Sequence, residues 1–314
     1  MSNIYNILGN IPSTKIEEIQ NIEYLKCSCY SGIEPIEAIS HFYKRYINPL
    51  ENYIELDEVI LADCGCGYGW LAFAFILSGG KYALCIDPDF RRLEAAKEIS
   101  EILNIDEKIA FICASISHLP FLDQTITVFA SIETLQHIWY NGKPSKRLTR
   151  KGIQEMSRVT QKYIIVKTPN NWFPIDHHDT GLLFAHWLPQ VIRTMYAKLF
   201  HRTKEYEYTN RFISHRFLEK YLKEFKLITA FHCYNDVDEW IENRPIYSPH
   251  GHIGYVAEIN KNNFKIKIFK IIFKLLKQRI RYFLPDIEGI YEKRGTYEKR
   301  GTVSSKEIKG GEKR

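Results

Sequence analysis

The sequence predicts an α/β fold in which helices cover both faces of a doubly wound, mostly parallel sheet that ends in an antiparallel hairpin. Short apolar runs typical of buried strands alternate with longer segments of helical periodicity between residues 51 and 260. A turn with three glycines, "DCGCGYG" (63–69), joins the first of these strands to a helix. Since ligands bind such sheets at the carboxyl ends of their strands, this turn is the first candidate for a binding site.

The individual elements are expected in a regular order. Strands are predicted at 58–63, 82–87, 108–114, 126–132, 162–168, 227–235 and 253–259. Helices are predicted at 70–78, 89–103, 146–160 and 214–225. The last helix is followed by two strands, which form the expected terminal hairpin of a Rossmann-like sheet. The expected organisation is an N-terminal helical cap at 1–50 and a main domain at 51–260, which contains an insertion at 169–213.

Composition excludes several classes of protein. The chain has 314 residues, of which 45% are hydrophobic and 25% are charged, an ordinary globular balance. Its start lacks a basic segment followed by a long apolar run, so no secretory signal is expected and the predicted location is the cytoplasm. The seven cysteines form no disulfide framework. Neither Cys-x-Cys pair has a second ligand pair at zinc-site spacing, so no metal is expected.

The glycine turn and the acidic residue after the next strand indicate a nucleoside ligand. The turn lacks the Gly-x-Gly-x-x-Gly spacing of dinucleotide sites and the Lys-Ser/Thr pair of phosphate loops. Asp87 ends the second strand, 18 residues after Gly69, where a carboxylate can accept hydrogen bonds from the two hydroxyls of an adenosine ribose. A nicotinamide dinucleotide site would also satisfy both observations, so these residues alone leave both ligands open.

A more specific resemblance comes from the residues of the turn. The stretch "LADCGCGYGW" (61–70) resembles the first motif of class I S-adenosylmethionine-dependent methyltransferases, which is matched position for position by Asp63, Gly65, Cys66, Gly67 and Gly69. The segment "HLPFLDQTITVFASIETLQHI" (118–138) resembles the one that these enzymes place across their third and fourth strands. The quinone-methylating branch and its uncharacterised relatives show this pattern most clearly.

This resemblance implies that the turn holds the adenosine and amino-acid parts of S-adenosylmethionine, a cation without phosphates. Asp63 is then expected to bind the ammonium group, and Asp87 the ribose, directly or through water. Two positions depart from the family pattern, because Ser115 stands where relatives have an acid for the adenine amino group and Thr127 replaces an Asp. The further residues that the resemblance places at the cofactor are Cys66, Pro88, Ser115, Ile116 and Glu133.

Methyl transfer is an in-line displacement at carbon, so positioning supplies much of the acceleration and a base is needed only for a protonated acceptor. His137 follows the fourth strand and is expected near the methyl group of the cofactor. Its alternative interpretation is a histidine at a helix start that bonds to the backbone.

The insertion "TPNNWFPIDHHDTGLLFAHWLP" (168–189) combines aromatic residues with His and Asp directly after the fifth strand. It resembles a segment of uncharacterised methyltransferases of this class, and we interpret it as a lid whose aromatic side chains form the acceptor pocket. Its candidate proton acceptors are Asp176, His178 and His186. A packed loop whose histidines cap backbone groups and a metal site are the alternatives.

Residues 261–285 predict a basic amphipathic helix. Basic residues recur there at spacings of three and four, and apolar residues fill most of the positions between them; the basic set is Lys267, Lys270, Lys274, Lys277 and Arg281. The pattern is typical of a helix on an anionic membrane surface, with packing on the body or RNA binding as alternatives. Residues 286–314 contain the repeat "YEKRGTYEKRGT" (291–302) and are expected to be disordered.

The expected function is methylation, at oxygen or carbon, of a small-molecule or lipid/glycan-linked acceptor. The expected location is the cytoplasm, at the inner face of the cell membrane if the basic helix binds there. A nucleic-acid methyltransferase and a non-catalytic cofactor-binding relative are the alternatives. Against the first, the segment "SIETLQHI" (131–138) differs from the Asn/Asp-Pro-Pro-aromatic motif of enzymes that methylate exocyclic amino groups.

Overall fold

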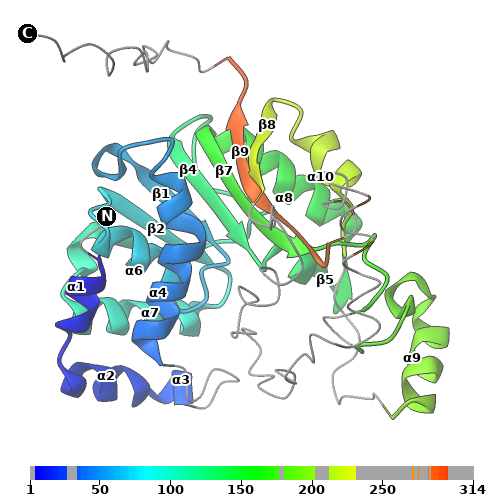
Figure 1. Cartoon of the computed structure of the whole chain (residues 1–314), viewed down its shortest axis with the longest axis horizontal. Coiled ribbons are helices and arrows are strands. Elements are labelled where there is room, and N and C mark those ends of the chain that lie inside the picture. The colour runs from blue at the N-terminus through cyan, green and yellow to red at the C-terminus, as the bar shows by residue number, and fades with distance from the viewer. Residues whose placement is uncertain are drawn as a thin grey trace, which may run out of the picture.

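A computed structural model describes residues 4–26, 34–176, 180–201, 212–230 and 284–295, with the single positions 271, 275 and 282. Its centre is a seven-stranded sheet in the order β3-β2-β1-β4-β7-β9-β8 (Figure 1). The strands are β1 (Ile60–Cys64), β2 (Tyr82–Asp87), β3 (Ile109–Cys113), β4 (Ile126–Ile132), β7 (Thr160–Pro169), β8 (Phe225–Ala230) and β9 (Asp286–Lys293). All neighbouring strands of this sheet are parallel except at β9, which runs antiparallel to both β7 and β8. The predicted α/β fold with a mostly parallel sheet is therefore confirmed.

Helices cover both faces of this sheet, as its apolar strands require. One face packs against α4 (Pro35–Phe42), α6 (Trp70–Leu77) and α7 (Phe90–Leu103). The other face packs against α8 (Lys146–Val159) and α10 (His215–Tyr221). Neighbouring strand residues such as Leu61 and Ala62 belong to different cores, because successive side chains of a strand point to opposite faces.

The remaining elements are short. The N-terminal segment forms α1 (Ile4–Gly9), α2 (Ser13–Gln20), α3 (Glu23–Lys26), the π-helical turn η1 (Tyr43–Ile47) and α5 (Asn48–Leu50), and packs with α4 on the α6 and α7 side. The 3-10 turns are η2 (Leu56–Glu58), η3 (Asp106–Lys108), η4 (Leu135–His137) and η5 (Ala185–Trp187). The strands β5 (Trp139–Tyr140) and β6 (Lys143–Pro144) form a separate hairpin, and α9 (Gln190–Leu199) follows the insertion.

The last strand of the sheet differs from the prediction. β9 occupies 286–293, which was expected to be disordered, and the predicted strand at 253–259 lies outside the described residues. β9 suits the sheet interior because Ile287 and Tyr291 pack in one core while Ile290 packs in the other. Gly289 allows the close approach of β8, since a Cβ atom there would lie 2.4 Å from the carbonyl oxygen of Thr229. The antiparallel partner of β8 therefore comes from further along the chain than expected.

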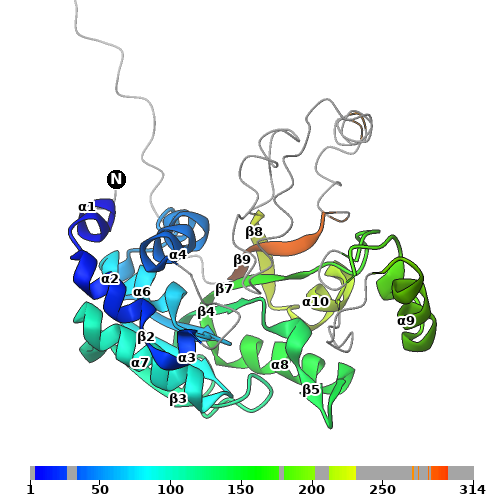
Figure 2. The same cartoon turned by 90° about the horizontal axis from the view of Figure 1, so that it is seen from below.

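The carboxyl ends of the parallel strands meet at one edge of the sheet, which points toward the lower part of Figure 1. Figure 2 looks onto this edge, with the N-terminal helices at one side and α9 at the other. Within the described ranges, no helix has the length and apolar character needed to cross a membrane. Most of the basic helix predicted at 261–285 lies outside the described residues. The exceptions are the single positions 271, 275 and 282 and residues 284–285, which lead into β9.

Candidate functional site

The glycine turn follows β1 at the carboxyl edge, and its backbone explains the three glycines. Gly65, Gly67 and Gly69 have φ angles of 76°, 55° and 83°, in the left-handed region that other residues rarely adopt. At Gly65 a Cβ atom would overlap the side chain of Thr134, so the turn packs directly against the end of β4. A Cβ atom at Gly67 would meet nothing within 4 Å. The turn therefore has one side packed on protein and one side open to a ligand.

Asp87 fixes the shape of this turn. Its Oδ2 accepts a hydrogen bond from the backbone N–H of Gly67 at 3.0 Å, and its Oδ1 accepts one from the N–H of Asp89 at 2.9 Å. The N–H groups of Gly65 and Cys66 donate to the carbonyl oxygen of Ile86. Each carboxylate oxygen of Asp87 retains a second lone pair, so the residue can shape the turn and still accept a bond from a ligand hydroxyl. Pro88 follows directly, at the start of the segment leading to α7.

Asp63 is a second buried acid beside Asp87. Burial raises the pKa of its carboxyl to about 7, with a further contribution from the charge of Asp87, while a hydrogen bond from the backbone of Ala72 in α6 acts in the opposite direction. Burial likewise raises the pKa of Asp87. Two buried carboxyls whose ionisation is disfavoured are stabilised by a nearby cation. The charge of the site thus fits a positively charged ligand and opposes a phosphate.

The segment after β3 carries two further predicted cofactor residues, Ser115 and Ile116. The Ser115 hydroxyl lies 3.1 Å from the Ser117 hydroxyl and accepts a bond from the Ser117 backbone N–H at 3.3 Å. The buried side chain of Ile116 packs toward Gly152 of α8, where a Cβ atom would approach it to 3.1 Å. Only the backbone of Ile116 is therefore placed to face a ligand at the carboxyl edge.

Glu133 lies in a tightly held position directly after β4. Its φ angle is 54°, unusual for a residue with a side chain. Its carboxylate lies 2.5 Å from Lys167 Nζ and accepts a bond from Gln136 Nε2 at 2.5 Å, while its backbone N–H donates to the carbonyl of Lys167. Burial disfavours the Lys167 cation, but the nearby carboxylates outweigh burial and raise its pKa. Sequence reasoning selected Glu133 and missed Lys167, whose position inside the apolar strand β7 gave no signal.

His137 ends η4, four residues after Glu133. Its backbone N–H donates to the carbonyl of Thr134 at 2.9 Å, and its half-buried ring lies 6.5 Å from the ring of Trp139. Because Thr134 also packs on Gly65, His137 is connected to the glycine turn through one short segment. The structure thus brings Asp63, Asp87, Glu133 and His137 to the same edge of the sheet.

The insertion after β7 is held by its own polar contacts. The carbonyl oxygen of Asn171 accepts a bond from Trp187 Nε1 at 2.6 Å and lies 3.2 Å from His186 Nε2. The buried carboxylate of Asp176 lies 2.8 Å from Arg193 Nη2 and accepts a bond from the Thr180 hydroxyl at 2.7 Å. These contacts brace the insertion, and the role of Asp176 and His186 in proton transfer stays a prediction. His178 lies outside the described residues.

The N-terminal segment reaches the glycine turn from the opposite side. The Tyr24 hydroxyl of α3 donates to Asp89 Oδ2 at 3.0 Å, and its ring lies 6.3 Å from the ring of Tyr68 within the turn. Asp89 caps α7 by accepting a bond from the N–H of Arg91. Helix α3 therefore contacts both Tyr68 and Asp89, which flank the predicted ribose site.

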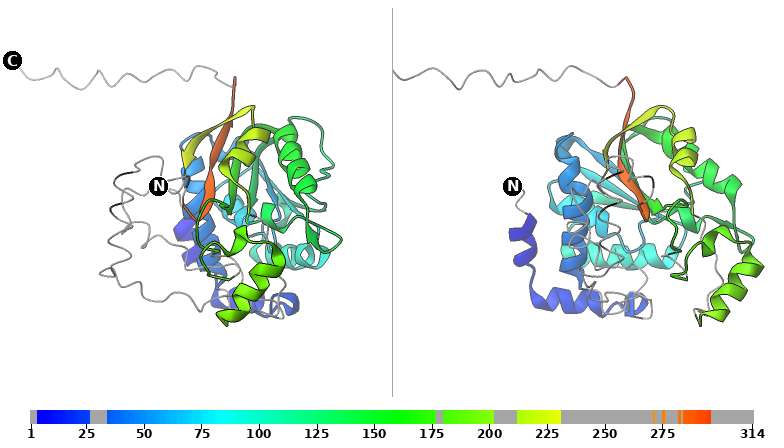
Figure 3. Two further views of the ribbon diagram at one scale, coloured as in Figure 1. Left: turned by 90° about the vertical axis from the view of Figure 1, so that its right-hand side faces the viewer. Right: turned by 45° about the vertical axis from the view of Figure 1, so that its right-hand side comes forward.

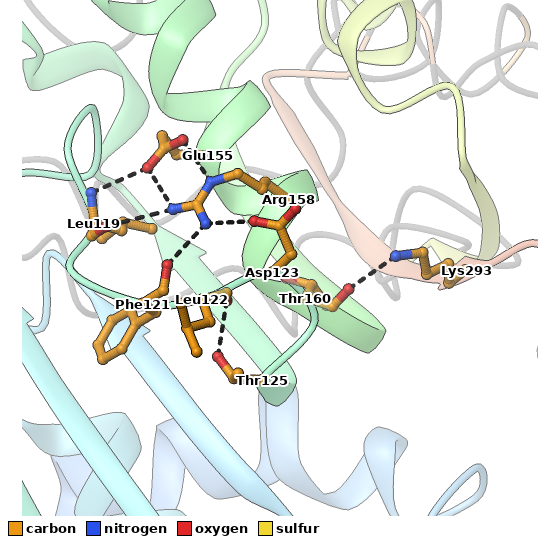
Figure 4. A network of polar contacts seen from close by, with 9 residues as sticks. All are labelled: Leu119, Phe121, Leu122, Asp123, Thr125, Glu155, Arg158, Thr160 and Lys293. Carbon is orange, nitrogen blue, oxygen red and sulfur yellow. Dashed lines mark hydrogen bonds and ion pairs between the residues drawn. The ribbon is translucent and has the colours of Figure 1, made fainter.

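Arg158 of α8 explains part of the second sequence motif (Figure 4). Its guanidinium bonds to Glu155, to Asp123 Oδ1 at 2.8 Å and to the carbonyls of Leu119 and Phe121. The segment 119–123 is thereby fastened to the end of α8, just before β7 begins. Its Asp and Leu-Pro-Phe residues thus hold the connection between β3 and β4. Sequence reasoning did not identify Arg158, because nothing near it in the chain marks its partners.

Within the described part of the chain, no group of three or more His, Cys, Asp or Glu residues is arranged to hold a metal ion.

Residues 62–163 match the family described as "Methyltransferase domain". The chain carries a class I S-adenosylmethionine-dependent methyltransferase domain. S-adenosylmethionine is its cofactor, and the glycine turn and both buried acids lie within or at the start of the matched region. The open side of Gly67 and the paired carboxyls fit this cationic ligand.

Among curated proteins, the ribosomal RNA small subunit methyltransferase G of Orientia tsutsugamushi (strain Ikeda) is 27% identical to the methyltransferase over 164 residues, which are 50% of this chain and 82% of that protein. Similar solved structures include a putative S-adenosylmethionine-dependent methyltransferase from Listeria monocytogenes (14% identity, 81% and 99% coverage of the two chains, TM-score 0.43). Another is magnesium protoporphyrin IX methyltransferase from Synechocystis PCC 6803 with bound SAH (11% identity, 72% and 89% coverage, TM-score 0.44).

Proposed function

We propose that this methyltransferase transfers a methyl group to an oxygen or carbon atom of a small-molecule or lipid-linked acceptor beside a membrane surface. The observation that carries the proposal is the aromatic character of the insertion after β7. Trp172, Phe184 and Trp187 all remain roughly half exposed there, and the rings of Phe184 and Trp187 stack at 4.9 Å. Such side chains form walls for apolar acceptors, whereas a soluble loop without a ligand would gain nothing from exposing them.

The cofactor is held, in this proposal, by the glycine turn and the acids around it. Gly65, Gly67 and Gly69 let the backbone approach the ligand, Asp63 faces its ammonium group and Asp87 accepts bonds from its ribose. When bound, S-adenosylmethionine supplies a methyl group on a cationic sulfur, which a nucleophile displaces to leave the demethylated product. The other residues proposed to line the cofactor are Cys66, Pro88, Ser115, the backbone of Ile116, and Glu133.

The polar groups after β4 are proposed to have two roles, Glu133 at the cofactor and His137 at the acceptor. Glu133 is held by Lys167 and Gln136, so its carboxylate has little freedom to move. His137 lies four residues further and can accept the proton that an acceptor hydroxyl releases as the oxygen–carbon bond forms. His186 is the second candidate for this role, since its ring is placed in the lid by Asn171 and lies 4.8 Å from Phe212.

The membrane part of the proposal is supported by the basic segment 261–285 of the sequence. Its five-residue stripe would gain about 1 kcal/mol per basic residue near an anionic surface, less after screening by salt. The chain leads from this segment directly into β9, which pairs with β7 at the carboxyl edge. A membrane contact there would bring the lid close to lipid-linked acceptors at the inner face of the cell membrane.

RNA is the second candidate acceptor, favoured by the 27% identity to a ribosomal RNA methyltransferase. The basic stripe suits phosphates as well as lipid headgroups. Against RNA, the segment 131–138 lacks the Asn/Asp-Pro-Pro-aromatic motif described above.

Transfer of radiolabelled methyl groups separates these candidates. The full-length protein is incubated with labelled S-adenosylmethionine and, in parallel reactions, with a membrane lipid extract and with ribosomal RNA. We expect label in the organic phase of the lipid reaction and none in purified RNA. Gly67→Val fills the open side of the turn and is expected to abolish labelling, so it serves as the cofactor-site control. Label in RNA alone would replace the lipid proposal by the second candidate.

A further inference from the structure

Helix α9 has its polar and apolar sides reversed. Its two buried residues are Arg193 and Ala197. Four large apolar residues of the same helix are instead between 51% and 74% exposed: Val191, Ile192, Met195 and Leu199. Surface helices of globular proteins normally place their apolar side against the core. The apolar side of α9 is therefore left largely uncovered by the other described residues.

A buried ion pair fixes this orientation. Arg193 Nη2 lies 2.8 Å from Asp176 Oδ2, and both side chains are buried. Thr180 donates to the same carboxylate oxygen, and the backbone N–H of Gly181 donates to the Asp176 carbonyl. Turning α9 to bury its apolar side would pull Arg193 away and leave a buried carboxylate without its cation, which is strongly unfavourable. The structure thus holds the apolar side outward.

The exposed apolar surface continues beyond α9. Leu183, Phe184 and Trp187 precede the helix in the chain and Phe200 follows it, and each of these side chains is about half exposed. Helix α9 stands outside the layers that cover the sheet, at the side of the carboxyl edge, in Figure 1 and in the right-hand view of Figure 3. Exposed apolar residues gathered in this way mark a surface that contacts another apolar phase or molecule.

The charge of the segment indicates which partner fits. Residues 180–201 contain no Asp or Glu, and of their two basic residues Arg193 is paired with Asp176 while Lys198 lies on the surface. Lys198 is exposed on α9 and His201 is exposed just after it. Cations beside aromatic and aliphatic side chains are typical of helices that lie in the interface of an anionic bilayer. Two copies of this surface would instead bring like charges together, which disfavours self-association.

We propose that α9 and the adjoining lid surface dock on an anionic lipid bilayer, with Val191, Ile192, Met195 and Leu199 inserted below the headgroups. This inference rests on the proposed function, because the bilayer would present a lipid-linked acceptor next to the lid. It adds a membrane contact that is independent of the basic segment 261–285.

Vesicle flotation with the full-length protein tests the inference, comparing phosphatidylglycerol/phosphatidylcholine vesicles with pure phosphatidylcholine vesicles. Met195→Glu and Leu199→Glu should each lower the apparent affinity for anionic vesicles roughly tenfold or more, as expected from the loss of one buried aliphatic side chain. Leu122→Glu is the matched control, since Leu122 is 79% exposed on a connection outside this surface and should bind like the wild type. Unchanged affinity for S-adenosylhomocysteine verifies that each variant is folded.

A further variant separates this inference from the proposed function: Lys267, Lys270, Lys274 and Lys277 are all replaced by Glu. If this variant loses vesicle binding while Met195→Glu keeps it, docking through α9 is wrong and the proposed function stands. Vesicle binding through α9 without methyl transfer to lipid extracts would support the docking and contradict the proposed acceptor. A wild type that ignores anionic vesicles, or that forms a dimer which Met195→Glu dissociates, would overturn the docking proposal.

Discussion

Asp63→Asn is expected to stabilise the cofactor-free protein and to weaken cofactor binding. Burial raises the pKa of the Asp63 carboxyl from 3.8 to about 7. Between these two values the folded state binds more protons than the unfolded state, so stability falls as the pH rises through this window. Above about pH 7 the ionised carboxylate therefore costs up to about 4 kcal/mol, at about 1.36 kcal/mol per pKa unit.

The amide has the size of the carboxyl and can still accept a bond from Ala72, but it carries no charge. We expect a gain of about 1–4 kcal/mol at pH 8, which shrinks toward pH 4 because the wild-type carboxyl becomes protonated in both states. The gain corresponds to a melting temperature that is higher by about 2–4 °C per kcal/mol. Affinity for S-adenosylmethionine should fall roughly 10–100-fold, because a hydrogen bond to a charged group contributes about 1.5–3 kcal/mol.

Thermal unfolding of the cofactor-free protein from about pH 4 to about pH 8 measures the first effect, and titration calorimetry measures the second. Asp57→Asn is a suitable control, since Asp57 is an exposed acid just before β1. The reasoning is refuted if Asp63→Asn is less stable than the wild type at the upper end of this range, or if it binds the cofactor normally.

Three further predictions concern the cofactor, the lid and the sheet. Asp87→Ala removes the ribose acceptor and the bond to Gly67, so calorimetry should show cofactor affinity weaker by about 1–3 kcal/mol; unchanged affinity would exclude this role. Trp172→Ala and His186→Ala should lower turnover at least ~10-fold and leave cofactor affinity nearly intact, whereas equal loss of both would indicate a folding role. Glu288→Ala leaves the largely buried Arg45 of η1 without this partner and should cost about 3–5 kcal/mol in urea unfolding, while Glu98→Ala, at an exposed position of α7, should cost less than about 0.5 kcal/mol; equal effects would contradict the placement of β9.

The sequence was sufficient for the centre of the parallel part of the sheet, because β1, β2 and β4 are buried along almost their whole length and read as apolar runs. β1, β2 and β4 lie within a few residues of their predicted ranges. The glycine turn was also predictable, since its φ angles require glycine and its acids stand at fixed positions next to the strands. These features depend on local chain geometry, which a sequence records directly.

β9 could not be predicted, because its polar residues are satisfied by distant parts of the chain. Glu288 lies inside the sheet, where Arg45 of η1 binds it through two hydrogen bonds of 2.9 and 2.7 Å. Without knowledge of that partner, the segment "DIEGIYEKR" reads as polar and interrupted by glycine. A buried charge makes a strand possible only when its counter-charge is present.

The same limit applies to the candidate site. Glu133 was identified from its motif. Its partner Lys167 was not, because a single lysine within the otherwise apolar strand β7 does not indicate a functional role. Asp176 was predicted to accept a proton, and only the structure reveals that its carboxylate binds Arg193. Residue types near the carboxyl edge were thus predictable, whereas the choice of partners required the fold.

Titration calorimetry of the wild-type protein with S-adenosylmethionine and S-adenosylhomocysteine tests the central claim most directly. We predict saturable binding of one ligand per chain for both compounds, and its loss in Gly67→Val, whose side chain would fill the open side of the turn. Absence of binding by a folded wild-type protein, or undiminished binding by Gly67→Val, would contradict the assignment of the glycine turn as the cofactor site.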